Sequence, residues 1–318
     1  MPRPRLTLKL SDTVFNSCAE LAALMEPVSP AMAMLQLSCG PTQGRLRVYG
    51  LGRFRVSVLE TSQTLFLSGP RRSDRLTLAF ELGSTCDLTK LRAQGAAMPW
   101  PGFLGFNQEL ADFDLRLPAG SQLTTLLLPK ALLQDNPRAT QGTLVSQRLQ
   151  QCNLLELKAQ QKAELARWLN ELSNNATDQP PEPIAKGLLD VSLTAFEKPT
   201  AQTRLNQARQ ERHNAALKML HRCMANPKDL VSSDALSEEL AVSRSALFKG
   251  CQEHFGLTPT QLQRSIRLDR VRTELLQGDG SIGAIAAEFG FQSRSHFARR
   301  YRGQFGELPQ TTPNVSQL

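Results

Sequence analysis

The chain has 318 residues, a formal net charge of +8 and a sequence pI near 9.4. This length allows two hydrophobic cores, and the positive balance favours nucleic acid over an acidic partner surface. The six cysteines form no CxxC pair and no apolar run approaches the roughly 18 residues of a membrane span, so disulfide scaffolds, zinc knuckles and membrane segments are not expected. Met1 to Leu10 lacks the apolar core of a signal peptide, and we expect a soluble protein of the reducing cytoplasm with no membrane partner.

Residues 35–128 carry their apolar side chains in short runs separated by Gly, Pro, Ser and Asp. Val56 and Val58 alternate with Arg55 and Ser57, which is the period of a half-buried strand. Strands are predicted at residues 45–49, 54–59, 64–67, 76–82 and 123–128. This pattern predicts a compact β sandwich or barrel within a first domain, residues 1–150.

The pattern becomes helical after Pro129. Leu165, Trp168, Leu169 and Leu172 recur at helical spacing, which predicts an amphipathic helix. Further on, residues 174–183 are predicted as a loop, 184–196 as a second helix and 197–203 as a linker. Residues 151–203 therefore form a helical region of their own, and from Arg204 onwards every segment carries helical periodicity.

The last third contains an internal repeat. Six residues of one copy, Ser243, Arg244, Ser245, Phe255, Gly256 and Pro259, recur as Ser293, Arg294, Ser295, Phe305, Gly306 and Pro309. Each copy is predicted to form helix, tight turn, helix. Ser233 and Ser281 are expected to cap the first helices, and Ser243 and Ser293 the second, because a hydroxyl there accepts from free backbone amides.

The second helix of each copy has an apolar face and an opposite polar face. The apolar faces carry Leu247, Cys251 and Phe255, and Phe297, Tyr301 and Phe305. The polar faces carry Ser245, Lys249 and Gln252, and Ser295, Arg299 and Arg302. A major groove admits a helix and offers acceptors to Lys and Arg. A solvated face is the better interpretation of a lone helix, but duplication in a basic segment favours DNA binding.

Residues 258–277 are predicted as one helix between the copies. Thr258 and Gln261 make a capping box, and Gly278 follows the helix end. About 19 residues at roughly 1.5 Å each span close to 30 Å, near the roughly 34 Å between successive major-groove entries. Its two apolar stripes, Leu262, Ile266 and Leu276, and Leu268, Val271 and Leu275, predict contacts with two separate lobes. Its arginines, Arg264, Arg267, Arg270 and Arg272, are expected to be solvated.

These residues resemble the AraC family of transcription activators over residues 207–309. The resemblance is carried by residues 266–268 and 275–276, by Ala286 to Phe291, by Ser293 to Phe297, and by Phe305, Gly306 and Pro309. It implies an AraC-type DNA-binding domain over 204–318, a cupin-like effector-sensing domain over 1–150, dimerisation through the helices of 151–203, and RNA polymerase as a partner. Segment 266–276 also resembles the ethanolamine-operon regulators of the family.

The expected fold class is therefore α+β: a β-rich, cupin-like domain with following helices, and an all-α double helix-turn-helix domain. By alignment with the family, double-stranded promoter DNA would contact eight residues, Arg244, Ser245, Phe248, Lys249, Arg294, Ser295, His296 and Arg299. Two departures from the family pattern are Val271, where Ala is usual, and Phe248, where a polar base-reading residue is common. The stripe at 165–172 is either a dimer face or a cover for the β domain.

No catalytic role is expected. All four histidines, His213, His221, His254 and His296, lie in the helical third, so the β domain cannot build a histidine-based metal centre. No nucleophile elbow, Walker loop or dinucleotide fingerprint is present, and no cofactor is predicted. The enzyme-class alternative is a DNA repair alkyltransferase with an AraC-like DNA-binding module. Cysteines before residue 201, however, have no His or second Cys nearby in sequence to activate a thiolate.

Two groups of residues bear on a small-molecule effector. Trp100, Phe103 and Phe106 form either an apolar pocket or ordinary core. Arg71 and Arg72, with Arg75, either hold an anionic effector or lie exposed on a hairpin. A small-molecule binding module without a regulatory role is a third functional alternative.

Overall fold

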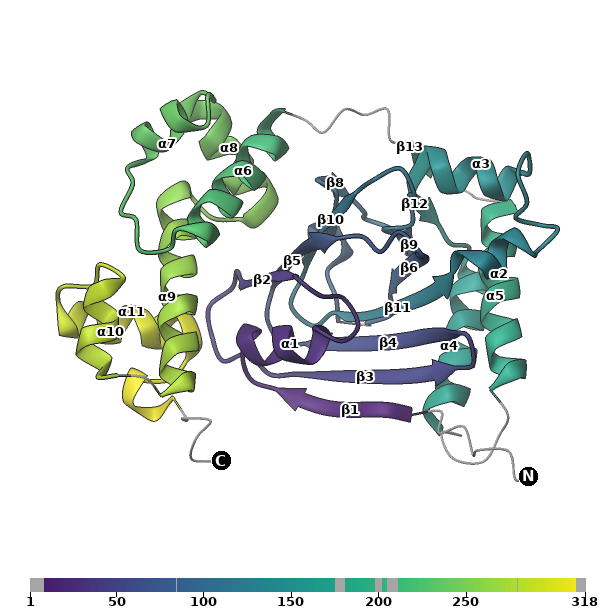
Figure 1. Cartoon of the computed structure of the whole chain (residues 1–318), viewed down its shortest axis with the longest axis horizontal. Coiled ribbons are helices and arrows are strands. Elements are labelled where there is room, and N and C mark those ends of the chain that lie inside the picture. Colours follow the sequence, from purple (N-terminus) through teal and green to yellow (C-terminus); the bar gives the residue numbers. More distant parts are fainter. Residues whose placement is uncertain are drawn as a thin grey trace.

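The computed structural model describes residues 9–83, 85–174, 181–197, 202–204, 211–278 and 280–312. These residues form two antiparallel sheets, a group of helices on one side of them and an all-helical C-terminal part on the other (Figure 1). The predicted α+β fold class is confirmed. Most of the segment Met1 to Leu10, which was expected not to be a signal peptide, lies outside the described residues, as does most of the predicted loop at 174–183.

Both sheets are built from antiparallel pairs. Sheet A has the order β1 (Lys9–Phe15), β3 (Gly44–Leu51), β4 (Phe54–Thr61), β11 (Gln122–Pro129), β6 (Arg75–Glu81), β9 (Gly102–Leu104), β12 (Cys152–Glu156) and β13 (Gln202–Arg204). Sheet B has the order β2 (Ala33–Gln36), β5 (Leu65–Pro70), β10 (Asp112–Leu117), β7 (Arg92–Ala93) and β8 (Ala96–Ala97). The five predicted strands are confirmed as β3, β4, β5, β6 and β11.

Sheet A has two buried faces because its side chains alternate along each strand. On β4, Val56 and Val58 join a core with the helices, whereas Leu59 joins the core shared with sheet B. A short helix, α1 (Cys18–Met25), is capped by Ser17 and closes one end of this second core with Leu21. The predicted sandwich is therefore correct, and it is covered by a helical layer on its other side.

That helical layer contains α2 (Lys130–Gln134), α3 (Leu144–Gln151), α4 (Ala159–Asn174) and α5 (Glu182–Glu197). Leu165, Leu169 and Leu172 on α4 are 0%, 6% and 0% exposed and pack against sheet A. The stripe that was a dimer-face candidate is thus core of the single chain, and the second alternative, a cover for the β domain, is correct. Trp168 packs so closely on α5 that a Cβ at Gly187 would collide with its indole ring.

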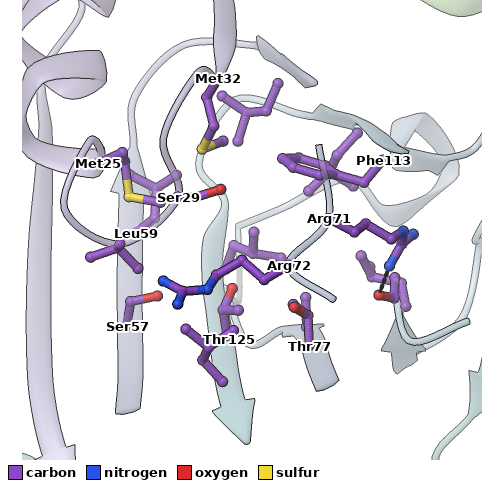
Figure 2. A pocket seen from close by; sticks show the side chains of 18 of the residues that line it. Met25, Ser29, Met32, Ser57, Leu59, Arg71, Arg72, Thr77, Phe113 and Thr125 are labelled. Carbon is purple, nitrogen blue, oxygen red and sulfur yellow. Dashed lines mark hydrogen bonds between the residues drawn. The ribbon is translucent and has the colours of Figure 1, made fainter. Parts of the chain in front are cut away.

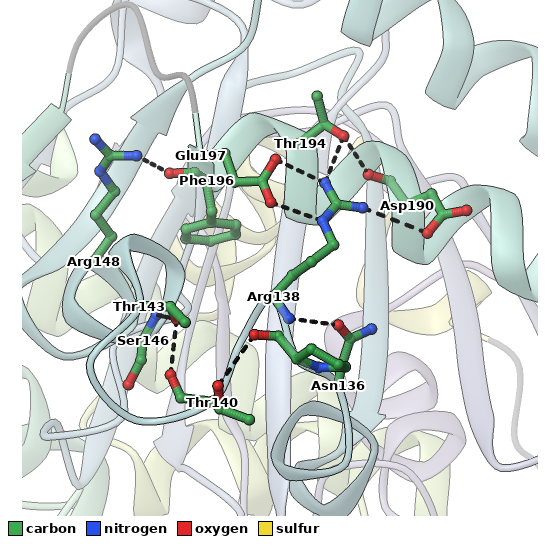
Figure 3. Close-up of polar contacts among 11 residues, drawn as sticks. Asn136, Arg138, Thr140, Thr143, Ser146, Arg148, Asp190, Thr194, Phe196 and Glu197 are labelled. Carbon is green, nitrogen blue, oxygen red and sulfur yellow. Dashed lines mark hydrogen bonds and ion pairs between the residues drawn. The ribbon is translucent and has the colours of Figure 1, made fainter.

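Arg138 ties the segment between α2 and α3 to α5 (Figure 3). Its Nε lies 2.7 Å from Glu197 Oε1, and its Nη2 donates to Thr194 Oγ1 at 2.8 Å. Arg148 on α3 donates to the carbonyl oxygen of Phe196. These bonds hold the C-terminal end of α5, from which the chain leaves the helical layer.

The aromatic group at residues 100–106 belongs to the core: none of its three rings lines the cavity between the sheets, and Phe106 only borders a polar pocket beside Asn107. Phe103 and Phe106 are 0% and 1% exposed, and their rings lie 6.0 and 4.8 Å from that of Phe196. Trp100 packs against the core between the sheets. Sheet A also continues beyond residue 150, because β12 and β13 pair within the segment predicted to be helical and linker. The rest of that linker, 198–201, lies outside the described residues.

The C-terminal part rests on the outer face of sheet B (Figure 1). It comprises α6 (Glu211–Ala225), α7 (Ser233–Glu239), α8 (Arg244–Phe255), α9 (Pro259–Gln277), α10 (Ile282–Glu288) and α11 (Arg294–Phe305). Leu35 on β2 and Phe66 on β5 join the core of its first lobe. Sheet B is therefore a shared wall, with the sandwich core on one face and the helical domain on the other.

Candidate nucleic-acid interface

The first lobe contains the helix-turn-helix formed by α7 and α8. The turn passes through Ala241, which has a φ of +52°, and Ser243 caps α8 by accepting from the Ala246 amide. Ser232, and not the predicted Ser233, caps α7, because the first of these two adjacent serines has the extended backbone of a cap. A Cβ at Gly250 would collide with the carbonyl oxygen of Arg212, so α6 and α8 approach closely there.

The second lobe repeats this arrangement with α10 and α11. The turn contains Gly290, at a φ of +79°, and Ser293 caps α11 by accepting from the His296 amide. The apolar face predicted for α11 is buried: Phe297, Tyr301 and Phe305 are 3%, 0% and 1% exposed. The corresponding face of α8, formed by Leu247, Cys251 and Phe255, is buried to the same degree. Both predicted helix-turn-helix units are confirmed as local structure.

A single 19-residue helix, α9, joins the lobes. Thr258 and Gln261 form the predicted capping box, and Gly278 ends the helix in the left-handed conformation. Leu262 and Ile266 belong to the core of the first lobe, whereas Leu268, Val271 and Leu275 belong to that of the second. One rigid helix of about 28 Å therefore fixes the distance between the lobes.

Two arginines of α9 are structural, contrary to the expectation that they are solvated. Arg272 is 6% exposed, pairs with Glu307 at 3.0 Å and lies over the ring of Phe305. Arg267 donates to the carbonyl oxygen of Phe289 at 3.1 Å. Both side chains therefore bind α9 to the second lobe. Because they are engaged there, we do not count them among the candidate DNA contacts.

All eight residues that were predicted to contact DNA are exposed. The structure brings Arg244, Ser245, Phe248 and Lys249 together on α8, and Arg294, Ser295, His296 and Arg299 on α11. Phe248 is 49% exposed and is the largest of the exposed apolar side chains among the described residues. Arg244 pairs with Asp234 of α7 at 2.8 Å, an exposed ion pair that contributes little to stability.

The C-terminal ends of α8 and α11 contact the sheets, a feature that the sequence did not reveal. The ring of Phe255 on α8 meets that of Phe66 on β5 edge to face, with centroids 5.0 Å apart. On α11, the side-chain amide of Gln304 donates to the carbonyl oxygen of Gln36 at 3.2 Å, and Gln36 donates back to the carbonyl oxygen of Gln304 at 3.1 Å. The β domain thus holds both lobes, while the N-terminal ends of α8 and α11 face solvent.

A buried histidine pair lies in the same interface. His213 on α6 is 2% exposed, and its Nε2 lies 3.0 Å from Asp114 Oδ1 on β10. The ring of His254 on α8 lies 4.7 Å from that of His213. Burial lowers the pKa of His254 to about 4, and the neighbouring His213 and Arg92 act in the same direction.

The described residues offer little support for the alkyltransferase alternative. All six cysteines lie in the described ranges as free thiols. Burial raises the pKa of Cys18, Cys86, Cys223 and Cys251, to about 11 for Cys223 and about 12 for Cys251, which opposes formation of a reactive thiolate. Within these ranges no group of three or more His, Cys, Asp or Glu side chains is placed to hold a metal ion. None of the helices described combines the length and apolar character of a membrane span.

A cavity of about 120 Å³ lies inside the β domain, between the inner faces of sheets A and B (Figure 2). Leu59 of sheet A and Leu67 of sheet B line it from opposite sides, and Arg71 and Arg72 line it near the turn that follows β5. None of the eight predicted DNA-binding residues belongs to its lining. The molecule therefore contains two separate candidate sites, one on the helical lobes and one within the sandwich.

Two capped helix-turn-helix units joined by one helix are the architecture of a double helix-turn-helix DNA-binding domain. Residues 236–314 match a helix-turn-helix domain family model. The HTH-type transcriptional activator RhaS of Pectobacterium atrosepticum is 28% identical over 150 residues, which cover 46% of this chain and 53% of that protein. The chain thus spans about half the length of such curated relatives. The XylDLEGF operon transcriptional activator 2 of Pseudomonas putida is 32% identical over 96 residues, covering 29% of this chain and 61% of that one.

Among solved structures, a probable AraC family transcriptional regulator from Rhodopseudomonas palustris is 30% identical and covers 31% of this chain and 94% of its own, with a TM-score of 0.30. The helical part of this chain is thus similar in sequence to regulators of the AraC family. These relatives are regulators by name, so the assignment as a non-enzyme agrees with the family. The finer resemblance to ethanolamine-operon regulators stays a prediction.

Proposed function

We propose that this chain is a sequence-specific regulator that places α8 and α11 in successive major grooves of promoter DNA. The observation that carries the proposal is the pair of exposed, capped helices held by a single rigid helix. The helix length of about 28 Å is close to the roughly 34 Å between groove entries on one face of the duplex. The N-terminal residues of a recognition helix commonly contact base edges, and these residues are exposed on both helices here.

We assign the base-reading roles to Arg244, Ser245, Phe248 and Lys249 on α8 and to Arg294, Ser295, His296 and Arg299 on α11. Arginine reads guanine through two acceptors, so Arg299 and Arg294 are the strongest candidates for specificity. Phe248 offers an apolar contact, such as with a thymine methyl group. The domain division that accompanies this proposal is 1–150 for sensing, 151–203 for the helical region and 204–318 for DNA binding.

Response to a small molecule is the second part of the proposal. The cavity inside the sandwich supports it, because β5 and β10 line the cavity and also carry the contacts with the helical domain. RNA polymerase is a proposed partner because relatives are named as activators. A homodimer stays a prediction, now without the α4 stripe as its surface. Action on promoters places the protein in the cytoplasm under this proposal.

Binding sites selected from random duplexes, followed by affinity measurements on single-base variants, test the proposal. Replacing Arg299 with Ala should cost about 1–3 kcal/mol at one base position and leave the other positions ranked as before. Arg167→Ala provides a matched control, because Arg167 is an exposed arginine on α4, in the layer behind sheet A. Binding should also weaken steeply with salt as counterions are released. If Arg299→Ala leaves affinity for every sequence unchanged, the assignment of α11 to the groove is wrong.

A further inference from the structure

The cavity within the β domain has a graded lining. The register of sheet A places Leu46, Leu59 and Leu123 in one row across three neighbouring strands. The next row towards the other end of these strands contains Ser57 opposite Thr125. All five residues line the cavity. One end of the space is therefore apolar, and hydroxyl groups begin about 7 Å further along, two residues on.

The polar end carries positive charge. Arg55, Arg71 and Arg72 all line the cavity there, and the single acidic residue of the lining is Asp114. The Asp114 carboxylate is directed to the other face of sheet B, where its Oδ1 lies 3.0 Å from His213 Nε2. The lining thus has an excess of cationic groups on its polar side, which favours an anion.

The two adjacent arginines have different surroundings. Arg71 is held by backbone carbonyl oxygens, since it donates to those of Gly105 and Asp112. Arg72 pairs with Asp74 at 3.2 Å, in an ion pair whose side chains are 40% and 57% exposed, and such pairs are weak. Figure 2 shows the Arg72 side chain reaching across the cavity towards the strands that carry Ser57 and Thr125. Arg72 is therefore the arginine best placed to exchange its partner for a ligand.

We propose that this cavity binds a small monocarboxylate with an apolar body of about six carbons, an identification that rests on the proposed effector response. Its carboxylate would meet Arg72 and the Ser57 hydroxyl, and its body would lie against Leu59. A cavity of about 150 Å³ accommodates benzene, and this one is about 120 Å³, so only the apolar body lies inside and the carboxylate lies at the end bordered by Arg72, whose side chain is 40% exposed. A sugar fits poorly, because its hydroxyl groups would be left without partners against the leucine wall, at about 1–3 kcal/mol each.

The roof of the cavity can adjust to such a ligand. This side is formed by Met25 at the end of α1 and by Val28, Ser29 and Met32 in the segment between α1 and β2 (Figure 2). Methionine side chains are unbranched and adapt to irregular shapes. In sheet B, Leu67 and Leu115 line the cavity, and their chain neighbours Phe66 and Asp114 contact the helical domain. A ligand in the cavity therefore contacts residues whose immediate chain neighbours contact α6 and α8.

Calorimetric titration of the full chain with cyclohexanecarboxylate and with the neutral cyclohexanecarboxamide tests the inference. The acid should bind the wild-type protein at least about tenfold more tightly than the amide, because the charge-assisted bond to Arg72 is made only by the anion. Arg72→Gln should abolish this preference while leaving amide affinity unchanged. Arg72 is exposed, so the substitution leaves the core intact. Arg75→Gln is the matched control: Arg75 pairs with the same Asp74 but does not line the cavity, and its variant should keep the preference.

Equal affinities for acid and amide in the wild-type protein would overturn the inference, as would equal effects of Arg72→Gln and Arg75→Gln. Binding of neither probe would overturn it as well. DNA protection by the same preparations, without a carboxylate present, separates this failure from failure of the proposed function. A chain that protects DNA but binds no probe refutes the ligand class alone, whereas a chain that binds the acid but protects no DNA refutes the proposed function alone.

Discussion

His254 should make the folded protein sensitive to acid. It is 5% exposed, and neither ring nitrogen has a hydrogen-bond partner among the described residues. Its folded-state pKa is about 4, whereas an unfolded chain binds the proton with a pKa of about 6.5. Between these two pKa values the unfolded state binds more protons than the folded state does. The free energy of unfolding is therefore unaffected by His254 above about pH 6.5 and decreases as the pH falls towards 4.

The size of this effect follows from the two pKa values. Lowering the pH from about 7.5 to about 5.5 should cost about 1 kcal/mol of unfolding free energy through this residue, and the limit below pH 4 is about 3 kcal/mol. His254→Phe removes the titrating group and keeps a ring beside His213. It also removes two unpaired polar atoms, each of which costs about 1–3 kcal/mol when buried. The variant should therefore be at least as stable as the wild type at pH 7.5 and clearly more stable at pH 5.5.

Urea unfolding at both pH values measures this difference. Asp269 complicates a single curve, because burial raises its pKa to about 6 and its contribution falls as the pH rises, in the opposite direction to His254. Comparing variant and wild type cancels this shared term. His221→Gln, a change to an exposed histidine of α6, is the control and should retain the wild-type dependence. An imidazole resonance of His254 that titrates near 6.5, or a His254→Phe variant with an unchanged pH dependence, would refute the reasoning.

Two further predictions concern the interface and the helical layer. Gln304→Ala removes the side-chain amide that donates to the carbonyl oxygens of Gln36 and Ser38. Hydrogen exchange should become faster in β2 and at the end of α11 but not in α8. Unchanged exchange in α11 would contradict the contact. Leu165→Ala should cost about 2–5 kcal/mol in thermal unfolding, as expected for a fully buried leucine, without changing the molar mass in sedimentation equilibrium; a lower molar mass at unchanged stability would restore the dimer-face alternative.

The helical domain was predictable because its signals are local. A serine before each recognition helix, the capping box at Thr258 and the glycine after α9 act within a few residues, so the sequence specifies them directly. Among these local signals the one error, Ser233 for Ser232, arose where two serines compete for one cap. The repeat then showed that the second lobe follows the same rules.

The interface between the domains was not predictable from the sequence. Gln36 and Gln304 are 268 positions apart and carry no signal of their own, since glutamine is common on exposed surfaces.

Three features within the domains were also not predictable. Arg272 was expected in solvent because its partner, Glu307, follows α11 in the sequence. Trp100, Phe103 and Phe106 suggested a pocket because apolar clusters look alike whether they enclose space or fill it. The short strands β7 to β9 fall below the length at which alternation is visible.

The two-faced character of sheet B has a consequence for how this protein changes over evolutionary time. Leu67 and Leu115 face the cavity, while the residues just before them, Phe66 and Asp114, contact α8 and α6 of the helical domain. Single substitutions at alternate positions of one strand therefore act on different properties of the regulator. Under the proposed function, substitutions at the cavity-facing positions can change ligand preference while the positions that contact α6 and α8, and with them the interface to the DNA-binding domain, stay the same.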